Sequence, residues 1–72
     1  MARREHRKVL GQTIRPHREG AGLTQERLAE KSHLTSKYLG EVERGVANIS
    51  VDMLLRIAKA LGLRLNDLTR EL

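Results

Sequence analysis

The sequence predicts an all-α domain built from five short helices. Apolar residues recur at helical spacing along most of the chain, and β-branched residues never alternate over a length that would form a strand. Hydroxyl side chains that can cap helices precede three of the apolar segments, at Thr24, Thr35 and Ser50. With 72 residues and no cysteine, we expect one domain, residues 1–72, without disulfides or thiolate metal sites.

The caps and the glycines that follow the apolar segments place the five helices. A first helix is expected from about Glu5 to Glu19, and a short last helix is expected to be capped by Asn66. Between them lie helices over residues 25–31, 36–44 and 51–61. The side chains expected to face inward are Leu10, Ile14, His17, Ala21, Leu28, Ala29, Leu39, Val42, Val51, Leu54, Leu55, Ala58, Leu61, Leu68 and Leu72.

The second and third helices are expected to cross steeply. Only residues 32–34 connect them, and two short helices joined so tightly cannot run side by side. An apolar residue precedes each of the three hydroxyl caps, and another follows four residues after it, which is the hydrophobic-staple pattern that fixes how the chain enters a helix. This spacing is typical of a helix-turn-helix unit.

Positive charge is concentrated at the start of the chain. Residues 1–18 contain six Lys or Arg and one Glu, whereas residues 19–72 contain eight cations and eight anions. A basic arm over residues 1–8 is expected to contact a polyanion, although the same charge could serve solubility alone. Tyr38 is the single aromatic residue, which disfavours recognition of single strands or RNA by base stacking.

Several other classes are excluded by what the sequence lacks. No apolar run approaches the roughly 20 residues of a membrane span, and the polar start does not resemble a secretion signal, so a cytoplasmic protein is expected. There is no nucleophile motif or glycine-rich phosphate loop, and His6, His17 and His33 share no metal-ligand spacing. We therefore expect no enzyme activity, no cofactor, no metal and no small-molecule ligand.

Four segments resemble the phage-repressor and Cro type (XRE-like) of helix-turn-helix protein. They are residues 22–29, 38–45, 48–50 and 54–62, and the resemblance extends from about Leu10 to Leu68. The short length and residues 31–38 are also similar to controller proteins of restriction–modification systems. The resemblance implies a five-helix, lambda-repressor-like domain whose third helix enters the major groove of double-stranded DNA, with the second helix crossing above it.

The resemblance also implies roles for individual residues. Arg18 and Glu43 are expected to form a mostly buried ion pair that braces the first helix against the third. His33 stands where the family usually has glycine, at a turn position that often needs a positive φ. The residues implied to contact DNA are Gln25, Thr35, Ser36, Lys37, Tyr38, Glu41, Arg44 and Asn48.

Some of these roles stay open at the level of sequence. Lys37 could donate to guanine or bind a phosphate, and Glu41 could accept from cytosine or hold Lys37 in place. Tyr38 could touch the sugar–phosphate backbone or pack over the second helix. Gly40 could allow close approach of the backbone to DNA or simply be tolerated within the helix.

The apolar residues near the C-terminus exceed what one small core can cover. We expect a homodimer interface formed by Val51, Met53, Leu63, Leu65, Leu68 and Leu72, although these leucines could instead close the monomer core. A twofold dimer would place two third helices about 34 Å apart, one turn of DNA. The predicted function is a homodimeric transcriptional regulator on a short palindromic operator, and the alternative is an antitoxin-type or adaptor module that binds another protein.

Overall fold

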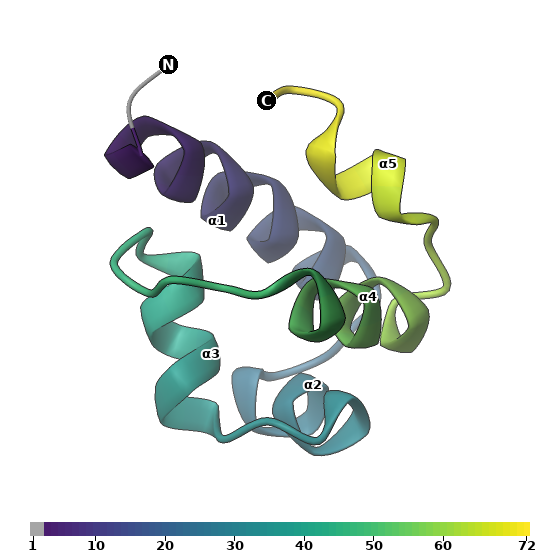
Figure 1. Cartoon of the computed structure of the whole chain (residues 1–72). Coiled ribbons are helices and arrows are strands. Elements are labelled where there is room, and N and C mark those ends of the chain that lie inside the picture. Colours follow the sequence, from purple (N-terminus) through teal and green to yellow (C-terminus); the bar gives the residue numbers. More distant parts are fainter. Residues whose placement is uncertain (1–2) are drawn as a thin grey trace.

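The computed structural model describes residues 3–72 and contains five helices in this range (Figure 1). They are α1 (Arg3–Gly20), α2 (Gln25–Ser32), α3 (Ser36–Glu43), α4 (Val51–Ala60) and α5 (Leu65–Thr69). No strand occurs among the described residues, so the predicted all-α class and the number and order of the helices are confirmed.

Three of the helices begin at the hydroxyl caps that the sequence indicates. The side-chain oxygens of Thr24, Thr35 and Ser50 accept hydrogen bonds of 3.1, 3.0 and 3.1 Å from backbone N–H groups three residues later. Each bond satisfies one of the N–H groups that a helix start leaves without an internal partner. The starts of α2, α3 and α4 are therefore encoded locally.

The start of α5 differs from the prediction. The helix begins after Arg64 rather than after Asn66, because the Asp67 carboxylate reaches back and accepts a 2.9 Å hydrogen bond from the Arg64 N–H. In a capping box, the acid three residues after the cap position accepts a hydrogen bond from the N–H of the cap residue. A hydroxyl cap acts in the opposite sense, because it accepts a hydrogen bond from the N–H three residues later. The capping signal was thus the acid and not the amide.

The turn between α2 and α3 is closed by a left-handed residue. His33 has φ 58° and ψ 42°, and the following N–H of Leu34 donates 2.8 Å to the Ala29 carbonyl. This is the conformation that the resemblance to the family suggested for His33. Glycine is usual at such a C-terminal stop, and His is one of the side chains that tolerate it better.

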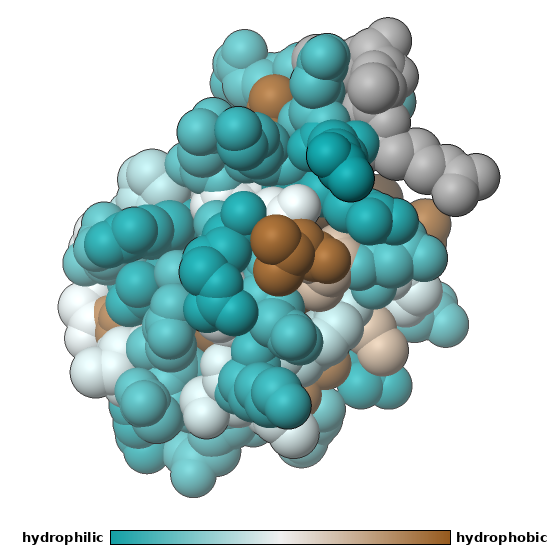
Figure 2. Space-filling model, turned by 90° about the vertical axis from the view of Figure 1, so that its left-hand side faces the viewer, coloured by the Kyte–Doolittle hydropathy of each residue, from teal (hydrophilic) through white to brown (hydrophobic). Residues whose placement is uncertain are grey.

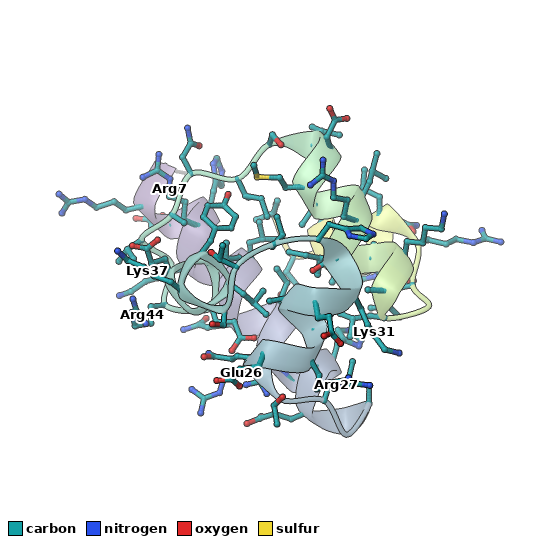
Figure 3. All side chains as sticks on the ribbon, turned by 90° about the horizontal axis from the view of Figure 1, so that it is seen from below. Arg7, Glu26, Arg27, Lys31, Lys37 and Arg44 are labelled. Carbon is teal, nitrogen blue, oxygen red and sulfur yellow. The ribbon has the colours of Figure 1, made fainter. Side chains whose placement is uncertain are left out.

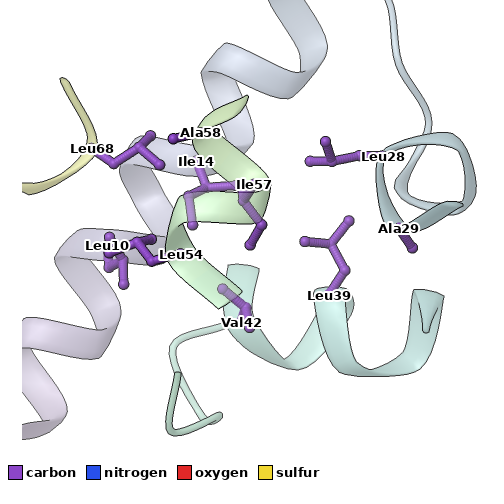
Figure 4. Close-up of a cluster of buried hydrophobic side chains, with 10 residues drawn as sticks. All are labelled: Leu10, Ile14, Leu28, Ala29, Leu39, Val42, Leu54, Ile57, Ala58 and Leu68. Atoms are coloured by element: carbon purple, nitrogen blue, oxygen red, sulfur yellow. The ribbon is translucent and has the colours of Figure 1, made fainter. Parts of the chain in front are cut away.

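The helices surround one core (Figures 1 and 4). α1 packs on α3 and α5, while α2 packs on α3 and α4. The buried apolar side chains where they meet are Leu10, Ile14, Leu28, Ala29, Leu39, Val42, Leu54, Ile57, Ala58 and Leu68. One face of α3 is thereby sealed against α1 and α2.

Several residues expected in the core lie at the surface. His17 is exposed, and Ala21 follows the end of α1, because the buried face of α1 runs through Leu10, Ile14 and Arg18 instead. On α4 the buried stripe is formed by Leu54, Ile57 and Ala58. The remaining corrections are Val51, Leu55 and Leu72, which are 63%, 45% and 46% exposed, and Leu61, which is half-buried.

Residues 3–8 of the predicted basic arm are helical and form the first turns of α1, which begins at Arg3 rather than near Glu5. Their contact with a polyanion stays a prediction. Residues 1–2 of the predicted arm lie outside the described residues. Over the range 3–72, no helix is both long enough and apolar enough to cross a membrane.

Gly11 lets α1 and α3 approach each other closely. A Cβ atom built on Gly11 would lie 2.5 Å from the carbonyl oxygens of both Val42 and Glu43. Contacts this short with backbone atoms cannot be relieved by turning a side chain, so the helices would have to separate. Gly11 therefore sets the distance between the two helices.

We expect Gly11→Ala to destabilise the fold by about 1–3 kcal/mol or more, the range found for overpacked cores. The matched control is Gly20→Ala at the end of α1, where an added Cβ has no neighbour within 4 Å. That change should be neutral or stabilising by up to about 1 kcal/mol, since Ala favours helix. Urea unfolding of both variants is the measurement, and equal stabilities would contradict the role of Gly11.

Candidate nucleic-acid interface

α3 has one buried face and one face open to solvent. Leu39, Val42 and Glu43 are buried, whereas Ser36 and Lys37 are exposed in the first turn. Figure 2 views the molecule from the α3 side and shows a largely hydrophilic surface with only small hydrophobic spots. Of the remaining side chains predicted to contact DNA, Thr35, Arg44 and Asn48 are exposed, and Gln25, Tyr38 and Glu41 are half-buried.

A buried ion pair holds α3 in place. The Nε and Nη2 atoms of Arg18 donate to the Glu43 carboxylate over 2.6 and 3.1 Å, and the two side chains are only 10% and 2% exposed. Arg18 Nη1 also donates 2.8 Å to the Leu23 carbonyl just before α2. The pair expected from the resemblance is therefore present, and it joins α1, α3 and the entry to α2.

The electrostatics of this pair keep Arg18 charged. The hydrogen bond to Glu43 raises the pKa of the Arg18 guanidinium above its ordinary value, as does the nearby negative charge of the same carboxylate, while burial acts in the opposite direction. Two parallel N–H···O bonds match the planar fork of a guanidinium to a carboxylate. No buried side-chain polar atom in the described range lacks a hydrogen-bond partner.

Gln25 is attached to the same carboxylate. Its Nε2 donates 3.1 Å to Glu43 Oε1, which leaves the second N–H of the amide available. Gly40 of α3 lies beside this side chain. A Cβ on Gly40 would be in ordinary van der Waals contact with Gln25 Oε1, at 3.5 Å, and would lie 3.3 Å from Arg44 Nη1, the flexible end of an exposed side chain. Packing within the protein therefore does not require glycine at this position.

Tyr38 fastens the first turn of α3 to the loop that follows the helix. Its hydroxyl donates 2.8 Å to the Asn48 carbonyl, and its ring is packed against the core. Burial, and secondarily the charge of Glu41, raises the pKa of Tyr38 above its ordinary value, so the phenol remains a donor. Neither sequence-based role for Tyr38 included this bond.

The structure brings together a basic groove that the sequence did not predict. Arg4, Arg7 and Lys8 of α1 line it on one side, and Arg44, Gly45 and Val46 line it on the other, together with Glu5. The sequence predicts an arm over residues 1–8 and places Arg44 at the end of the third helix, and only the packing of α1 on α3 brings the two together. We name this feature the α1–α3 groove.

The residues predicted to form a dimer interface are not all at the surface. Leu68 is fully buried, so its predicted place in an interface is wrong, because α5 inserts this side chain into the monomer core. Met53, Leu63 and Leu65 are half-buried. Val51 and Leu72 are exposed and line one hollow between α1, α4 and the C-terminus.

Residues 14–68 match the family model described as Helix-turn-helix (HTH_3). The chain belongs to this helix-turn-helix family. It is a family of DNA-binding transcriptional regulators, and the matched range contains all of α2 to α4, most of α5 and the part of α1 from Ile14 onward. Membership confirms the resemblance seen in the sequence and agrees with the prediction of a non-enzymatic protein.

Curated relatives in this helix-turn-helix family include regulators and control proteins. A transcriptional regulator of Mycobacterium tuberculosis is 47% identical over 71% of this chain, which spans 36% of that protein, about a third of its length. The control protein C.BamHI of Bacillus amyloliquefaciens is 38% identical over 86% of this chain and 78% of its own. The immunity repressor of Bacillus phage phi105 is 39% identical over 88% of this chain and 44% of its own.

Solved structures of the helix-turn-helix family show the same fold. The restriction–modification controller protein C.AhdI from Aeromonas hydrophila superposes with a TM-score of 0.85 at 40% identity, covering 86% of this chain and 94% of its own. The clp gene regulator ClgR from Corynebacterium glutamicum gives 0.86 at 37% identity, covering 90% and 69%. The arrangement of the five helices is therefore that of known regulators.

We expect Arg18→Met to destabilise the protein by about 3–5 kcal/mol, because the Glu43 carboxylate would remain buried without its counterion. The exposed pair Arg15–Glu19, with side chains 64% and 54% exposed, offers a control. Arg15→Met should cost less than about 1 kcal/mol, since exposed ion pairs contribute little. Thermal unfolding distinguishes the two, and a stable Arg18→Met protein would contradict the bracing role.

Proposed function

We propose that the chain is a homodimeric transcriptional regulator that uses α3 to recognise a short palindromic operator in double-stranded DNA. The observation that carries this proposal is the two-faced character of α3. Its inner face is held by buried apolar contacts and by the Arg18–Glu43 pair, and its outer face is polar. A polar helix on a rigid support is what reading of base edges requires.

The dimensions of α3 support insertion into the major groove. An α-helix with its side chains is about 10–12 Å in diameter, and the major groove is about 12 Å wide, so α3 can lie in it. Ser36 and Lys37 stand in the first turn of the helix, which is the part that enters deepest in helix-turn-helix complexes. We assign base contacts to Ser36, Lys37 and Glu41.

Glu41 is assigned to base readout rather than to holding Lys37. None of the ion pairs among residues 3–72 joins these two side chains, although they are one helical turn apart. A carboxylate in the major groove can accept a hydrogen bond from cytosine N4. The proposed partner of Lys37 is guanine, through O6 and N7.

Three of the remaining predicted contacts, those of Gln25, Arg44 and Asn48, are assigned to the DNA backbone. Gln25 stands at the N-terminus of α2, where unpaired N–H groups and the helix dipole favour phosphate. Arg44 follows α3 directly, and Asn48 lies in the loop that Tyr38 holds. Thr35 lies beside the turn that reads bases, and its hydroxyl accepts the hydrogen bond that caps α3, so we assign it to capping the helix.

The proposed dimer forms through the exposed apolar residues of α4 and the C-terminus. Val51 and Leu55 are one turn apart on α4, and Val51 shares a hollow with Leu72. All three are at least 45% exposed, and a second copy would remove them from water. The side chains of Met53, Leu63 and Leu65 are already half-buried in the monomer, so each would add only its exposed part to the interface.

Selection of bound sequences from random duplex DNA, followed by sizing of the complex, tests this function. We expect enrichment of a palindrome whose half-sites lie about one helical turn apart, bound by two chains. Absence of affinity for any duplex, at low as well as physiological salt, would overturn DNA binding and leave the protein-interaction alternative. One chain bound to a single half-site would overturn the dimer alone.

We expect Glu41→Ala to relax sequence preference at one position of each half-site, by about 1–3 kcal/mol between the preferred base pair and the others. Glu30→Ala removes the same charge from an exposed position of α2 that forms only a surface pair with Arg27. That control should keep the preference of the wild type. Repeating the selection with both variants provides the measurement, and an unchanged preference for Glu41→Ala would exclude readout by this residue.

A further inference from the structure

The α1–α3 groove is a built feature of the fold and not a flexible tail. Gly45 has φ 77°, and a Cβ on it would lie 2.8 Å from Lys8 Cα and 3.0 Å from Lys8 N. The loop after α3 therefore rests directly on the backbone of α1. Hydrogen bonds of 3.0 Å from Gly45 N to the Val42 carbonyl and from Val46 N to the Glu41 carbonyl fix the loop to α3.

Most of the positive charge in this groove has no carboxylate partner among the described residues. Arg4, Arg7, Lys8 and Arg44 line it with Glu5 as the single acid, so it carries three net positive charges. None of these four cations takes part in an ion pair among the described residues. Cations held close together without carboxylate partners repel one another, so they favour an anion between them.

The groove also has an apolar edge. Val46 is 61% exposed and lies in the loop beside Arg44 and Gly45. A sugar–phosphate backbone alternates an anionic group with an apolar deoxyribose, so cations beside an exposed aliphatic side chain complement it. A free inorganic anion would use only the cations.

We propose that the α1–α3 groove binds one phosphodiester group of duplex DNA, next to the base pairs that α3 reads. The proposal rests on the function proposed above. Arg44 follows the last residue of α3 directly, so the groove continues the surface of that helix. In Figure 3, Arg7, Lys37 and Arg44 project to one side of the view, whereas Arg27 and Lys31 project to another.

In this arrangement Arg7 and Arg44 face the phosphate from two elements. A guanidinium presents paired N–H donors that match phosphate oxygens, and guanidinium groups from α1 and from the end of α3 would hold the anion from both sides. The contact carries no sequence information and fixes the angle of the protein on the duplex. Arg4, Arg7 and Lys8 thus form one wall of a phosphate site.

The test is the salt dependence of binding for the double variant Arg4→Gln/Arg7→Gln. Affinity is measured for a duplex selected by the wild type and for a scrambled duplex of the same composition. We expect both affinities to fall by the same factor, roughly tenfold, and the log–log salt slope to decrease in magnitude by about 0.9, the value for one phosphate. Thermal unfolding should be unchanged, because neither side chain forms an ion pair within the described residues.

The matched control is Lys59→Gln/Arg64→Gln, which removes the same charge from the end of α4 and the loop before α5, on the opposite side of Figure 1 from α3. It should leave the slope unchanged, because charges farther away than about 8 Å are screened at physiological salt.

Three outcomes would overturn the inference, and they differ from one another. An unchanged slope and affinity for Arg4→Gln/Arg7→Gln, with a wild type that binds, would remove the phosphate site and leave the proposed function intact. Weakening for the selected duplex alone would show that these residues read bases instead. A wild type that binds neither duplex would overturn the proposed function and the groove together.

Discussion

The buried pair of Arg18 and Glu43 is the interaction on which the rest of this structure depends. It is the one place where a charge from α1 meets a charge from α3 inside the described fold, and its atoms also reach the chain before α2 and the side chain of Gln25. Because a buried guanidinium and carboxylate tolerate little change in geometry, the pair fixes the relative positions of three helices. The apolar core also stabilises the fold, but the hydrophobic effect is non-directional and does not fix the angles between the helices in this way.

The close approach at Gly11 and the ion pair act on the same two helices. Gly11 allows the α1 backbone to reach the carbonyl groups at the end of α3, and Arg18, two turns further along α1, holds Glu43 from the side. Together they present the outer face of α3 at a defined angle and bring Arg44 beside the first turns of α1. The proposed base contacts and the phosphate site therefore depend on one helix–helix contact.

Local features of the fold could be predicted from the sequence, and features that arise from packing could not. The helix caps act within one turn of the chain, so the sequence predicted the roles of Thr24, Thr35 and Ser50. The Arg18–Glu43 pair joins distant parts of the chain and was predicted only from the resemblance to a family. Leu55 and Leu68 share the same chemistry, and only the angles at which α4 and α5 pack decide that one is exposed and the other buried. The α1–α3 groove joins residues about 40 positions apart, for which periodicity gives no signal.

The most direct test of the central claim separates stability from orientation. In the double variant Arg18→Met/Glu43→Leu, apolar side chains replace the whole ion pair, an exchange that is often neutral or stabilising in other proteins. We predict a folded protein with near wild-type unfolding free energy and at least tenfold weaker binding to the selected duplex, because α3 and Gln25 lose their fixed positions. Wild-type affinity in a variant of equal stability would contradict the account.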